Sequence, residues 1–265
     1  MKKALLRTAV MFLAFASNLP AVTVATQSGT NPSTDAPDNG APWGNVILTN
    51  GASGVYLGGG WVLTAAHVYD DQASPYVTYN STQYYADLNE VYTLQNSSTA
   101  QLQGLSADAD LVLFRLDTEL SGLPTISLGD VTTNMNITMI GFGGGKTWGT
   151  NTVDPQNLAS NFNVTDGNDF VGFQTDYDSG VSTEGQGIIG DSGGAAFAFV
   201  GGEWKLIGMM QAVDDAGNPT KTYFSSMSQY SSQINSIISN AGAIPEPSAL
   251  LLSCPAFLLL LRRKR

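Results

Sequence analysis

From position 46 onward the chain is a series of short apolar or alternating runs separated by turn residues, and this pattern strongly limits its fold. Runs of roughly four to eight residues at such spacing are typical of strands in a barrel or sandwich. The 29 glycines suit the many tight turns that such a fold needs. Representative runs are Val46–Leu48, Gly54–Leu57, Trp61–Leu63, Tyr76–Tyr79, Leu111–Leu116, Ile137–Ile140, Ala195–Val200 and Leu206–Met210.

One segment near the end of these runs has a different period. Between Met227 and Ile238 the apolar residues recur at steps of three and four, which is a helical stripe. A serine at 225 or 226 can cap its start, and Gly242 lies just past its end. The sequence therefore predicts an all-β domain that is closed by one C-terminal helix at about 225–240.

Composition excludes several classes of function. The 265 residues include 11 Lys+Arg and 22 Asp+Glu, which gives a formal net charge of -11. This balance argues against a nucleic-acid partner, because affinity for phosphates comes from Lys and Arg. With one Cys and one His, the chain has neither a disulfide framework within the chain nor a multi-His or Cys-rich zinc centre. We expect no metal and no organic cofactor.

The N-terminus has the pattern of a secretory leader. Lys2, Lys3 and Arg7 precede an apolar run from 9 to 16, and small residues follow as far as Ala25. The alternative is a first helix of the domain, but eight apolar residues are too few to span a bilayer. We expect residues 1–25 to be a signal peptide that is cut after Ala25. Residues 26–42, rich in turn-forming types, then form a flexible lead-in.

The C-terminus carries three features in order: Pro245–Pro247, an apolar stretch from 249 to 261, and the basic residues Arg262–Arg265. This order, over 244–265, resembles the PEP-CTERM sorting signal of Gram-negative bacteria. The resemblance implies processing by an exosortase-type enzyme, transient membrane association through the tail, and a final place between the periplasm and the cell surface or extracellular matrix. The alternative is a plain hydrophobic tail anchor. Without both ends, residues 26–244 carry a formal charge of about -17 and no Cys.

Three short motifs carry the candidate chemistry. His67 ends the run Leu-Thr-Ala-Ala-His, Asp110 leads the apolar run 111–116, and Ser192 lies within Gly-Asp-Ser-Gly-Gly. A serine hydroxyl needs a base to become a nucleophile. Imidazole, with an unperturbed pKa of about 6.5, suits that role. A carboxylate behind the imidazole fixes its tautomer. Singly, each has a plainer interpretation: a surface His, a strand-leading acid close to Asp108, and a serine in a glycine turn.

Taken together and in this order, the motifs resemble the chymotrypsin/trypsin family of serine proteases, and 137–143 resembles that family's strand ending in Gly-Trp-Gly. The resemblance runs from about 46 to 238. It implies two packed antiparallel six-stranded β-barrels, about 43–122 and 133–224, within a domain at 43–240. It also implies an endopeptidase acting on protein or peptide substrates through an acyl-enzyme. The catalytic residues would be His67, Asp110 and Ser192, with the N–H groups of Gly190 and Ser192 as the oxyanion hole.

The sequence departs from the family around the substrate pocket. The position that usually sets specificity is Gln186, not Asp, so a preference for Arg or Lys is not expected. The opposite pocket wall would be Gln211, Ala212 and Val213. No hydrophobic activation sequence occurs near residues 43–46, so the sequence does not predict activation by insertion of a new N-terminus at Asp191. Either Asp191 has another partner, or the site is formed without cleavage.

Several alternatives follow from these departures. One is a non-catalytic or weakly active surface or matrix protein that kept the scaffold. A Deg-type periplasmic protease is another, although the chain has no room for an added peptide-binding domain.

Two ligand sites were also considered from the sequence. The glycine-rich stretch 143–147 lacks the full spacing of a phosphate loop. Four acids could hold calcium in a loop, but they lack regular ligand spacing; they are Asp166, Asp169, Asp176 and Asp178.

Overall fold

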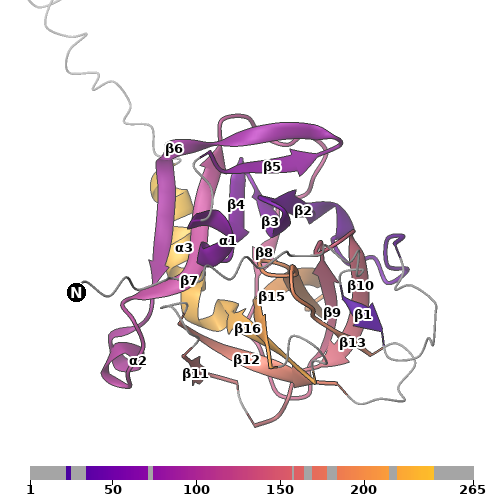
Figure 1. The fold of residues 1–265 in the computed structure, drawn as a ribbon, viewed down its shortest axis with the longest axis vertical. Coiled ribbons are helices and arrows are strands. Elements are labelled where there is room, and N and C mark those ends of the chain that lie inside the picture. Colours follow the sequence, from indigo (N-terminus) through magenta and orange to yellow (C-terminus); the bar gives the residue numbers. More distant parts are fainter. Residues whose placement is uncertain are drawn as a thin grey trace, which may run out of the picture.

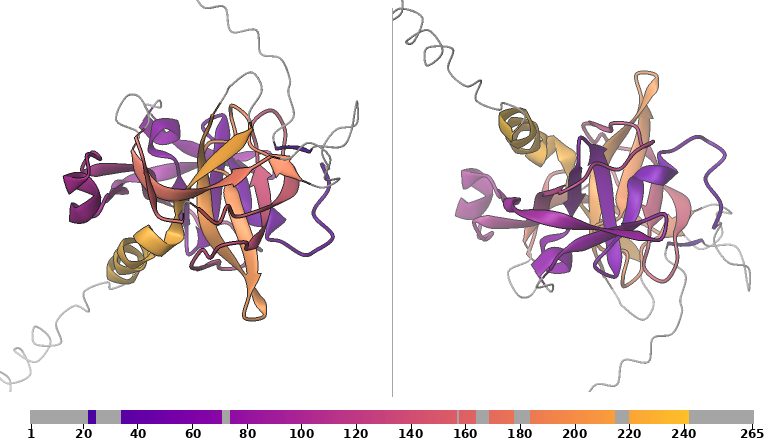
Figure 2. Two further views of the ribbon diagram at one scale, coloured as in Figure 1. Left: turned by 90° about the horizontal axis from the view of Figure 1, so that it is seen from below. Right: turned by 90° about the horizontal axis from the view of Figure 1, so that it is seen from above.

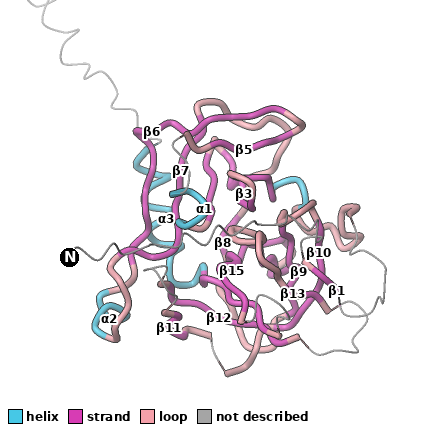
Figure 3. The backbone as a smooth tube through the Cα atoms, in the orientation of Figure 1, coloured by secondary structure: helices cyan, strands magenta, loops and turns pink. Residues whose placement is uncertain are grey.

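The computed structural model describes residues 22–24, 34–70, 74–156, 158–163, 169–177, 184–214 and 220–241. The predicted sorting tail at 244–265 lies outside the described residues, as do residues 1–21 and 25 of the predicted leader and residues 26–33 of the predicted lead-in. Within the described part, no helix has the length and apolar character needed to cross a membrane. Strands are its main secondary structure, as Figure 3 shows.

The first half of the domain is a closed six-stranded barrel with antiparallel neighbours, in the order β2-β3-β4-β7-β6-β5 (Figure 1). Its interior is filled by apolar side chains such as Ile47, Val62 and Phe114. This confirms the first predicted barrel. The strands are β2 (Val46–Thr49), β3 (Ala52–Gly58), β4 (Trp61–Thr64), β5 (Tyr76–Tyr79), β6 (Thr82–Gln95) and β7 (Asp108–Leu116).

The second half is an eight-stranded sheet, whose main path runs β10-β9-β14-β15-β16-β12-β11. Its eighth strand, β8, pairs with β15 in parallel, whereas the other ladders are antiparallel. The second lobe is thus strand-built as predicted, with more strands than the six expected. The strands are β8 (Ser127–Leu128), β9 (Asn136–Gly141), β10 (Thr147–Thr152), β11 (Ser160–Phe162), β12 (Phe170–Asp176), β14 (Ala195–Val200), β15 (Glu203–Val213) and β16 (Lys221–Ser226). A separate two-stranded ladder joins β1 (Thr23–Val24) to β13 (Gly185–Gln186).

Helices are few and peripheral (Figure 2). The predicted C-terminal helix is α3 (Met227–Ala241), which follows β16 directly and buries Met227, Tyr230 and Ile234. The short elements are η1 (Trp43–Asn45), α1 (Ala66–Asp70) and α2 (Ser98–Leu102).

One apolar core joins the two lobes to α3. Leu63 and Leu111 of the first barrel belong to the same buried cluster as Phe197 of the second sheet and Ile234 of α3. Burying a side chain as large as Phe197 or Leu63 contributes about 1.5–3 kcal/mol. The shared core therefore fixes the lobes against each other, and residues from both meet where β4, β7 and the turn before β14 approach.

Candidate active site

His67 and Asp110 come from neighbouring elements of the first barrel. β4 pairs with β7 in a register that sets Thr64 opposite Val112, and α1 begins two residues later. Nδ1 of His67 lies 2.8 Å and 3.0 Å from the two carboxylate oxygens of Asp110. The His67 backbone N–H also donates to Asp110 Oδ1, at 3.0 Å. This carboxylate is 2% exposed and the His67 side chain 32%. An ionised carboxylate can only accept, so Nδ1 carries the proton and Nε2 is left as a base.

The main chain of Asp110 is held from the second lobe. Its N–H donates to the Asp169 carbonyl at 2.9 Å. Nε2 of Gln211 donates to the Asp110 carbonyl at 2.8 Å and to Oγ of Ser225 at 3.0 Å. Gln211 thus supports the backbone of the acid and leaves its carboxylate to His67.

Ser192 lies in a tight turn in which the next residue, at position 193, has to be glycine. Gly193 has φ of +77°, and a Cβ added there would lie 2.1 Å from the Ser53 carbonyl oxygen and 2.4 Å from Oγ1 of Thr64. The Ser53 N–H donates to the Ser192 carbonyl at 3.0 Å. The turn is therefore fastened to β3 of the first barrel.

We expect Gly193→Ala to remove activity and to destabilise the fold by more than the roughly 1–3 kcal/mol of a strained backbone alone. The physical reason is the clash with Ser53 in addition to the positive φ. Gly201→Ala is the matched control, since Gly201 has φ of +66° but nothing within 4 Å of its added Cβ. Urea unfolding and peptide hydrolysis measure both effects. Equal losses in the two variants would contradict the close approach.

The turn also contains two backbone N–H groups, those of Gly190 and Ser192, that are suited to stabilising an anion. Gly190 adopts φ of +99°, and its added Cβ would meet Gly143 at 3.0 Å. Across the described residues, neither the Gly190 nor the Ser192 N–H donates a hydrogen bond to another protein group. Both are thus available to an incoming oxygen, as an oxyanion hole requires. Their role in that hole stays a prediction.

Asp191, the residue before Ser192, accepts hydrogen bonds from partners that the sequence did not predict. Its buried carboxylate accepts N–H groups from Val22 at 2.9 Å, Ile188 at 2.9 Å and Gly143 at 3.2 Å. Burial raises the pKa of Asp191 to about 6, although these N–H groups act to lower it. The residues at 43–46 do not supply the partner of Asp191; Val22, from further upstream, does.

The segment that reaches Asp191 contains Val22 and lies well upstream of residues 43–46, where an activation sequence is expected from the family resemblance. Val22 is fully buried in the core of the second lobe. Its carbonyl accepts a hydrogen bond from Oγ1 of Thr147 at 3.3 Å, and the next two residues form β1 against β13. The apolar and small residues of this segment read as the end of a leader, so no sequence signal separated a docked strand from it.

Comparison with known proteins decides the family. The family model for trypsin matches residues 31–234. The chain belongs to the trypsin family. Membership makes it a hydrolase of the serine endopeptidase class. None of the curated proteins matches it.

Solved structures support the trypsin-like fold. The first is the inactive mutant form of Rv3671c from M. tuberculosis H37Rv, at 13% identity and a TM-score of 0.50, covering 82% of this chain and 97% of that one. The inactive form of the Rv3671c protease has 15% identity and a TM-score of 0.52, covering 78% and 98%.

In this trypsin-family chain a small pocket lies beside Ser192. Its volume is about 130 Å³. Gln211, Ala212 and Val213 line it, and their role as a substrate pocket stays a prediction. Gln186 does not; it pairs with Thr23 in the ladder of β13 and β1. The full lining is Gly187, Ile188, Ile189, Gly190, Asp191, Ser192, Met210, Gln211, Ala212, Val213 and Thr222.

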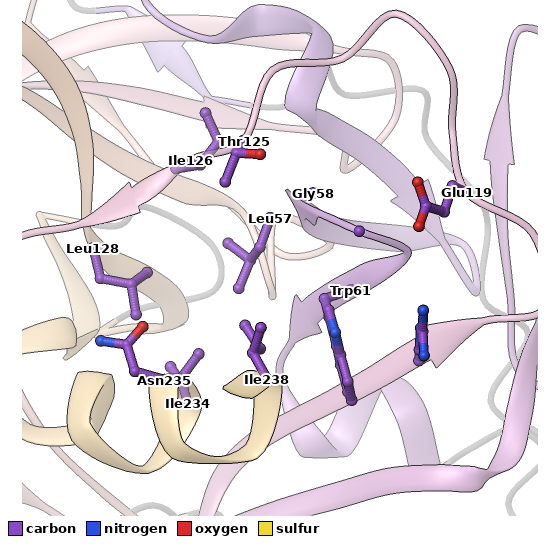
Figure 4. A pocket seen from close by; sticks show the side chains of 12 residues that line it. Leu57, Gly58, Trp61, Glu119, Thr125, Ile126, Leu128, Ile234, Asn235 and Ile238 are labelled. Atoms are coloured by element: carbon purple, nitrogen blue, oxygen red, sulfur yellow. The ribbon is translucent and has the colours of Figure 1, made fainter. Parts of the chain in front are cut away.

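A larger pocket, of about 410 Å³, lies between the first barrel and α3. Figure 4 shows Trp61 on one side of it and Ile234 and Ile238 of α3 on another. None of the three candidate catalytic residues lines this pocket. We therefore place the candidate active site at the smaller pocket, where Ser192 is part of the wall.

The glycine-rich stretch at 143–147 has a structural role. Gly143 donates to Asp191, and Nζ of Lys146 lies 4.4 Å from the Trp43 ring centroid and donates to the Trp43 carbonyl. Burial lowers the pKa of Lys146 to about 8. This lysine is packed on an aromatic ring, which agrees with the exclusion of a phosphate loop.

The described residues contain no group of three or more His, Cys, Asp or Glu side chains that could hold a metal ion. Asp169 accepts the Ser106 N–H at 2.7 Å, and Asp176 pairs with Lys221 at 3.5 Å. Asp166 and Asp178, the other candidate calcium ligands, lie outside the described residues.

Proposed function

We propose that this protein is an exported serine endopeptidase that cleaves peptide bonds through Ser192, His67 and Asp110. The observation that carries the proposal is the pairing of His67 Nδ1 with both oxygens of the buried Asp110, close to a Ser192 turn that is tied to the same barrel. The pairing places the imidazole proton on Nδ1, so that Nε2 can act as the base. Within the described part of the chain, the Gly190 and Ser192 N–H groups of the turn donate to no other protein group.

The proposed reaction has two stages. As Ser192 Oγ attacks the substrate carbonyl, His67 Nε2 takes its proton, and Asp110 stabilises the resulting imidazolium. The tetrahedral oxygen is held by the N–H groups of Gly190 and Ser192, each worth a factor of about 100–1000 in rate. His67 then gives the proton to the leaving amine. Water, activated by the same His67, hydrolyses the acyl-enzyme and restores Ser192.

The test is hydrolysis of casein by the purified protein, with and without prior treatment by a fluorophosphonate. We expect hydrolysis that the reagent abolishes. A folded protein that neither hydrolyses casein nor reacts with the reagent would support the alternative, a non-catalytic surface or matrix protein. A weakly active protein would react with the reagent but turn over slowly. The paired His67 and Asp110 favour the enzyme, since a scaffold protein has no need for this arrangement.

Export is supported by the leader pattern, and sorting to the cell surface by the tail at 244–265. We further propose that the leader is cut between Ala21 and Val22 and not after Ala25. A cut after Ala25 would remove the fully buried Val22 and the β1 strand. A cut before Val22 converts its N–H into an ammonium group 2.9 Å from the Asp191 carboxylate. The mature protein would then begin Val-Thr-Val, which N-terminal sequencing of the exported form checks.

The cut should change how stability depends on pH. In an uncut chain the pKa of Asp191 is about 6, above its ordinary 3.8, so the native state binds this proton more tightly than the unfolded state. The contribution of Asp191 to stability is then fully present below about pH 4 and is lost as pH rises through 6. An ammonium at Val22 favours the ionised carboxylate, so the cut chain should lose less stability over this range.

Thermal melting between pH 4 and 7.5 measures this difference. The two proteins are the chain beginning at Val22 and the same chain extended by Pro20 and Ala21. We expect the chain that begins at Val22 to have the higher Tm, and we expect the difference in Tm between the two chains to widen as pH rises. In Asp191→Asn the advantage should no longer depend on pH in this range. An advantage in the unsubstituted chain that stays constant from pH 4 to 7 would argue against the ion pair.

A further inference from the structure

Asn96 is a buried residue at which three segments of the chain meet. It directly follows β6, and its backbone N–H donates to the Ala107 carbonyl, just before β7, at 2.9 Å. Its Nδ2 lies 3.1 Å from the carbonyl oxygen of Ser106, 3.2 Å from that of Asp108 and 3.3 Å from that of Asp169. Carbonyl oxygens only accept, so the amide nitrogen faces all three. Asn96 therefore links the end of β6 and the start of β7 to the residue that precedes β12.

The oxygen of the same amide is held by α3. The hydroxyl of the buried Tyr230 donates to Asn96 Oδ1 at 2.7 Å and accepts the Val171 N–H at 2.8 Å. A hydroxyl has one hydrogen and an amide oxygen cannot donate, so the direction of both bonds is fixed. Burial raises the pKa of Tyr230; the Val171 N–H acts to lower it and the charge of Asp110 to raise it. The hydroxyl therefore keeps the proton that it donates.

These contacts reach the main chain of Asp110 from two sides. The Asp169 carbonyl, which accepts from Asn96, also accepts the Asp110 N–H, at 2.9 Å. The Asp108 carbonyl, two residues before Asp110 on β7, is held by the same Asn96 amide. The carboxylate that accepts from His67 with both oxygens is thus carried by a stretch of backbone that this amide holds in place.

We propose that Tyr230 and Asn96 are positioning residues for catalysis, through which α3 fixes the main chain at Asp110 so that its carboxylate meets Nδ1 of His67. The proposal rests on the proposed function, because it concerns the acid of that triad. Both residues act through Asp110 and not on the substrate. Their loss should therefore lower kcat and leave KM nearly unchanged.

The test is Tyr230→Phe, which removes one oxygen and keeps the buried ring. α3 should stay docked beside β6 (Figure 1), because Gln233 keeps its two hydrogen bonds with the main chain of Gln95, at 2.8 Å and 3.0 Å. A fluorophosphonate titration first counts the active sites. For a peptide that the unsubstituted protein cleaves, we expect kcat to fall about tenfold, within the roughly 100-fold cost of a 1 Å misplacement.

Tyr56→Phe is the matched control. The hydroxyl of this buried tyrosine also bonds two groups, the N–H groups of Gly60 and Leu120, but it lies within the first barrel. The two variants should lose a similar amount in Tm, and only Tyr230→Phe should lose activity. In addition, if Tyr230 acts through Asn96, adding Tyr230→Phe to Asn96→Ala should cost little further kcat, because residues of one network are not additive.

A second readout is the proton resonance of Nδ1–H in His67. A strong hydrogen bond to a carboxylate moves such a proton far downfield. His67 is the only histidine in the sequence, so its imidazole resonances have no histidine counterpart elsewhere in the chain. We expect the Nδ1 proton to move upfield in Tyr230→Phe and to stay in place in Tyr56→Phe. A merely structural role of Tyr230 would leave it unmoved in both.

The outcomes separate this proposal from the proposed function. If the titration counts active sites but Tyr230→Phe matches Tyr56→Phe in kcat and in the His67 resonance, α3 only supports the fold and the proposed function stands. A change confined to KM would also overturn the positioning role. Fully additive losses in the double variant would overturn the route through Asn96. If the reagent labels nothing and no peptide is cleaved, both proposals fall.

Discussion

Replacing Ser192 with alanine is expected to lower kcat for peptide hydrolysis by about a million-fold, the order seen when the nucleophile of such a triad is removed. The change deletes one oxygen from a half-buried side chain. The bonds that hold the turn are made by backbone atoms, including the Ser53 N–H to the Ser192 carbonyl at 3.0 Å. The fold and its Tm should therefore be nearly unchanged while chemistry is lost.

The control for this variant is Ser98→Ala, because Ser98 is exposed at the start of α2, in the first half of the chain. It should retain full activity. Peptide hydrolysis and thermal melting are measured for the two variants side by side. Residual hydrolysis in Ser192→Ala within tenfold of the unsubstituted protein would mean that another group is the nucleophile.

Asp110→Asn should cost about 10⁴-fold in kcat, a magnitude known for this change in a triad. Both oxygens of Asp110 accept from His67: one from Nδ1 alone, and one from Nδ1 and the backbone N–H. An asparagine keeps one acceptor. If its oxygen stays with the backbone N–H, its amide nitrogen faces Nδ1, which must then accept a hydrogen bond. The imidazole proton would move to Nε2, and the base would be lost.

The loss in Asp110→Asn should be largest near neutral pH and should shrink in alkaline solution, where hydroxide can replace the missing base. A pH–rate profile of the variant, with Tm measured at each pH, checks this. Asp108→Asn is the matched control, since Asp108 lies two residues away in β7, is exposed, and accepts from the side chain of Gln95 and not from His67. If both variants keep full activity, Asp110 does not orient the base.

Local sequence patterns predicted much of the domain. Five of the six strands of the first barrel carry clear apolar runs, and α3 carries a stripe from Met227 to Ile238, so these elements were predicted close to where they are observed. The sixth strand, β6, was not among the predicted runs, because most of its side chains are exposed or half-buried. The pairing of His67 with Asp110 followed from motifs that each belong to one strand end. Such features depend on neighbours in the chain, which a sequence displays directly.

What was missed depends on contacts between distant segments. β1, β8 and β13 are two residues long, too short for any periodicity to show. Val22 reads as leader because a docked apolar residue and a leader residue have the same composition. Thr222 enters the pocket only through the register of β15 and β16, and Gln186 leaves it by pairing with Thr23. Whether Thr222 or Gln186 lines the pocket could not be predicted without knowing how the strands pair.

The most direct test of the central claim is to locate the fluorophosphonate adduct by mass spectrometry in the protein purified in its native, folded state. The assignment of Ser192 as a nucleophile activated by His67 predicts one adduct per molecule, on the peptide that contains Ser192. It also predicts that His67→Ala prevents its formation. An adduct on any other residue, or equal labelling in His67→Ala, would contradict the proposed active site.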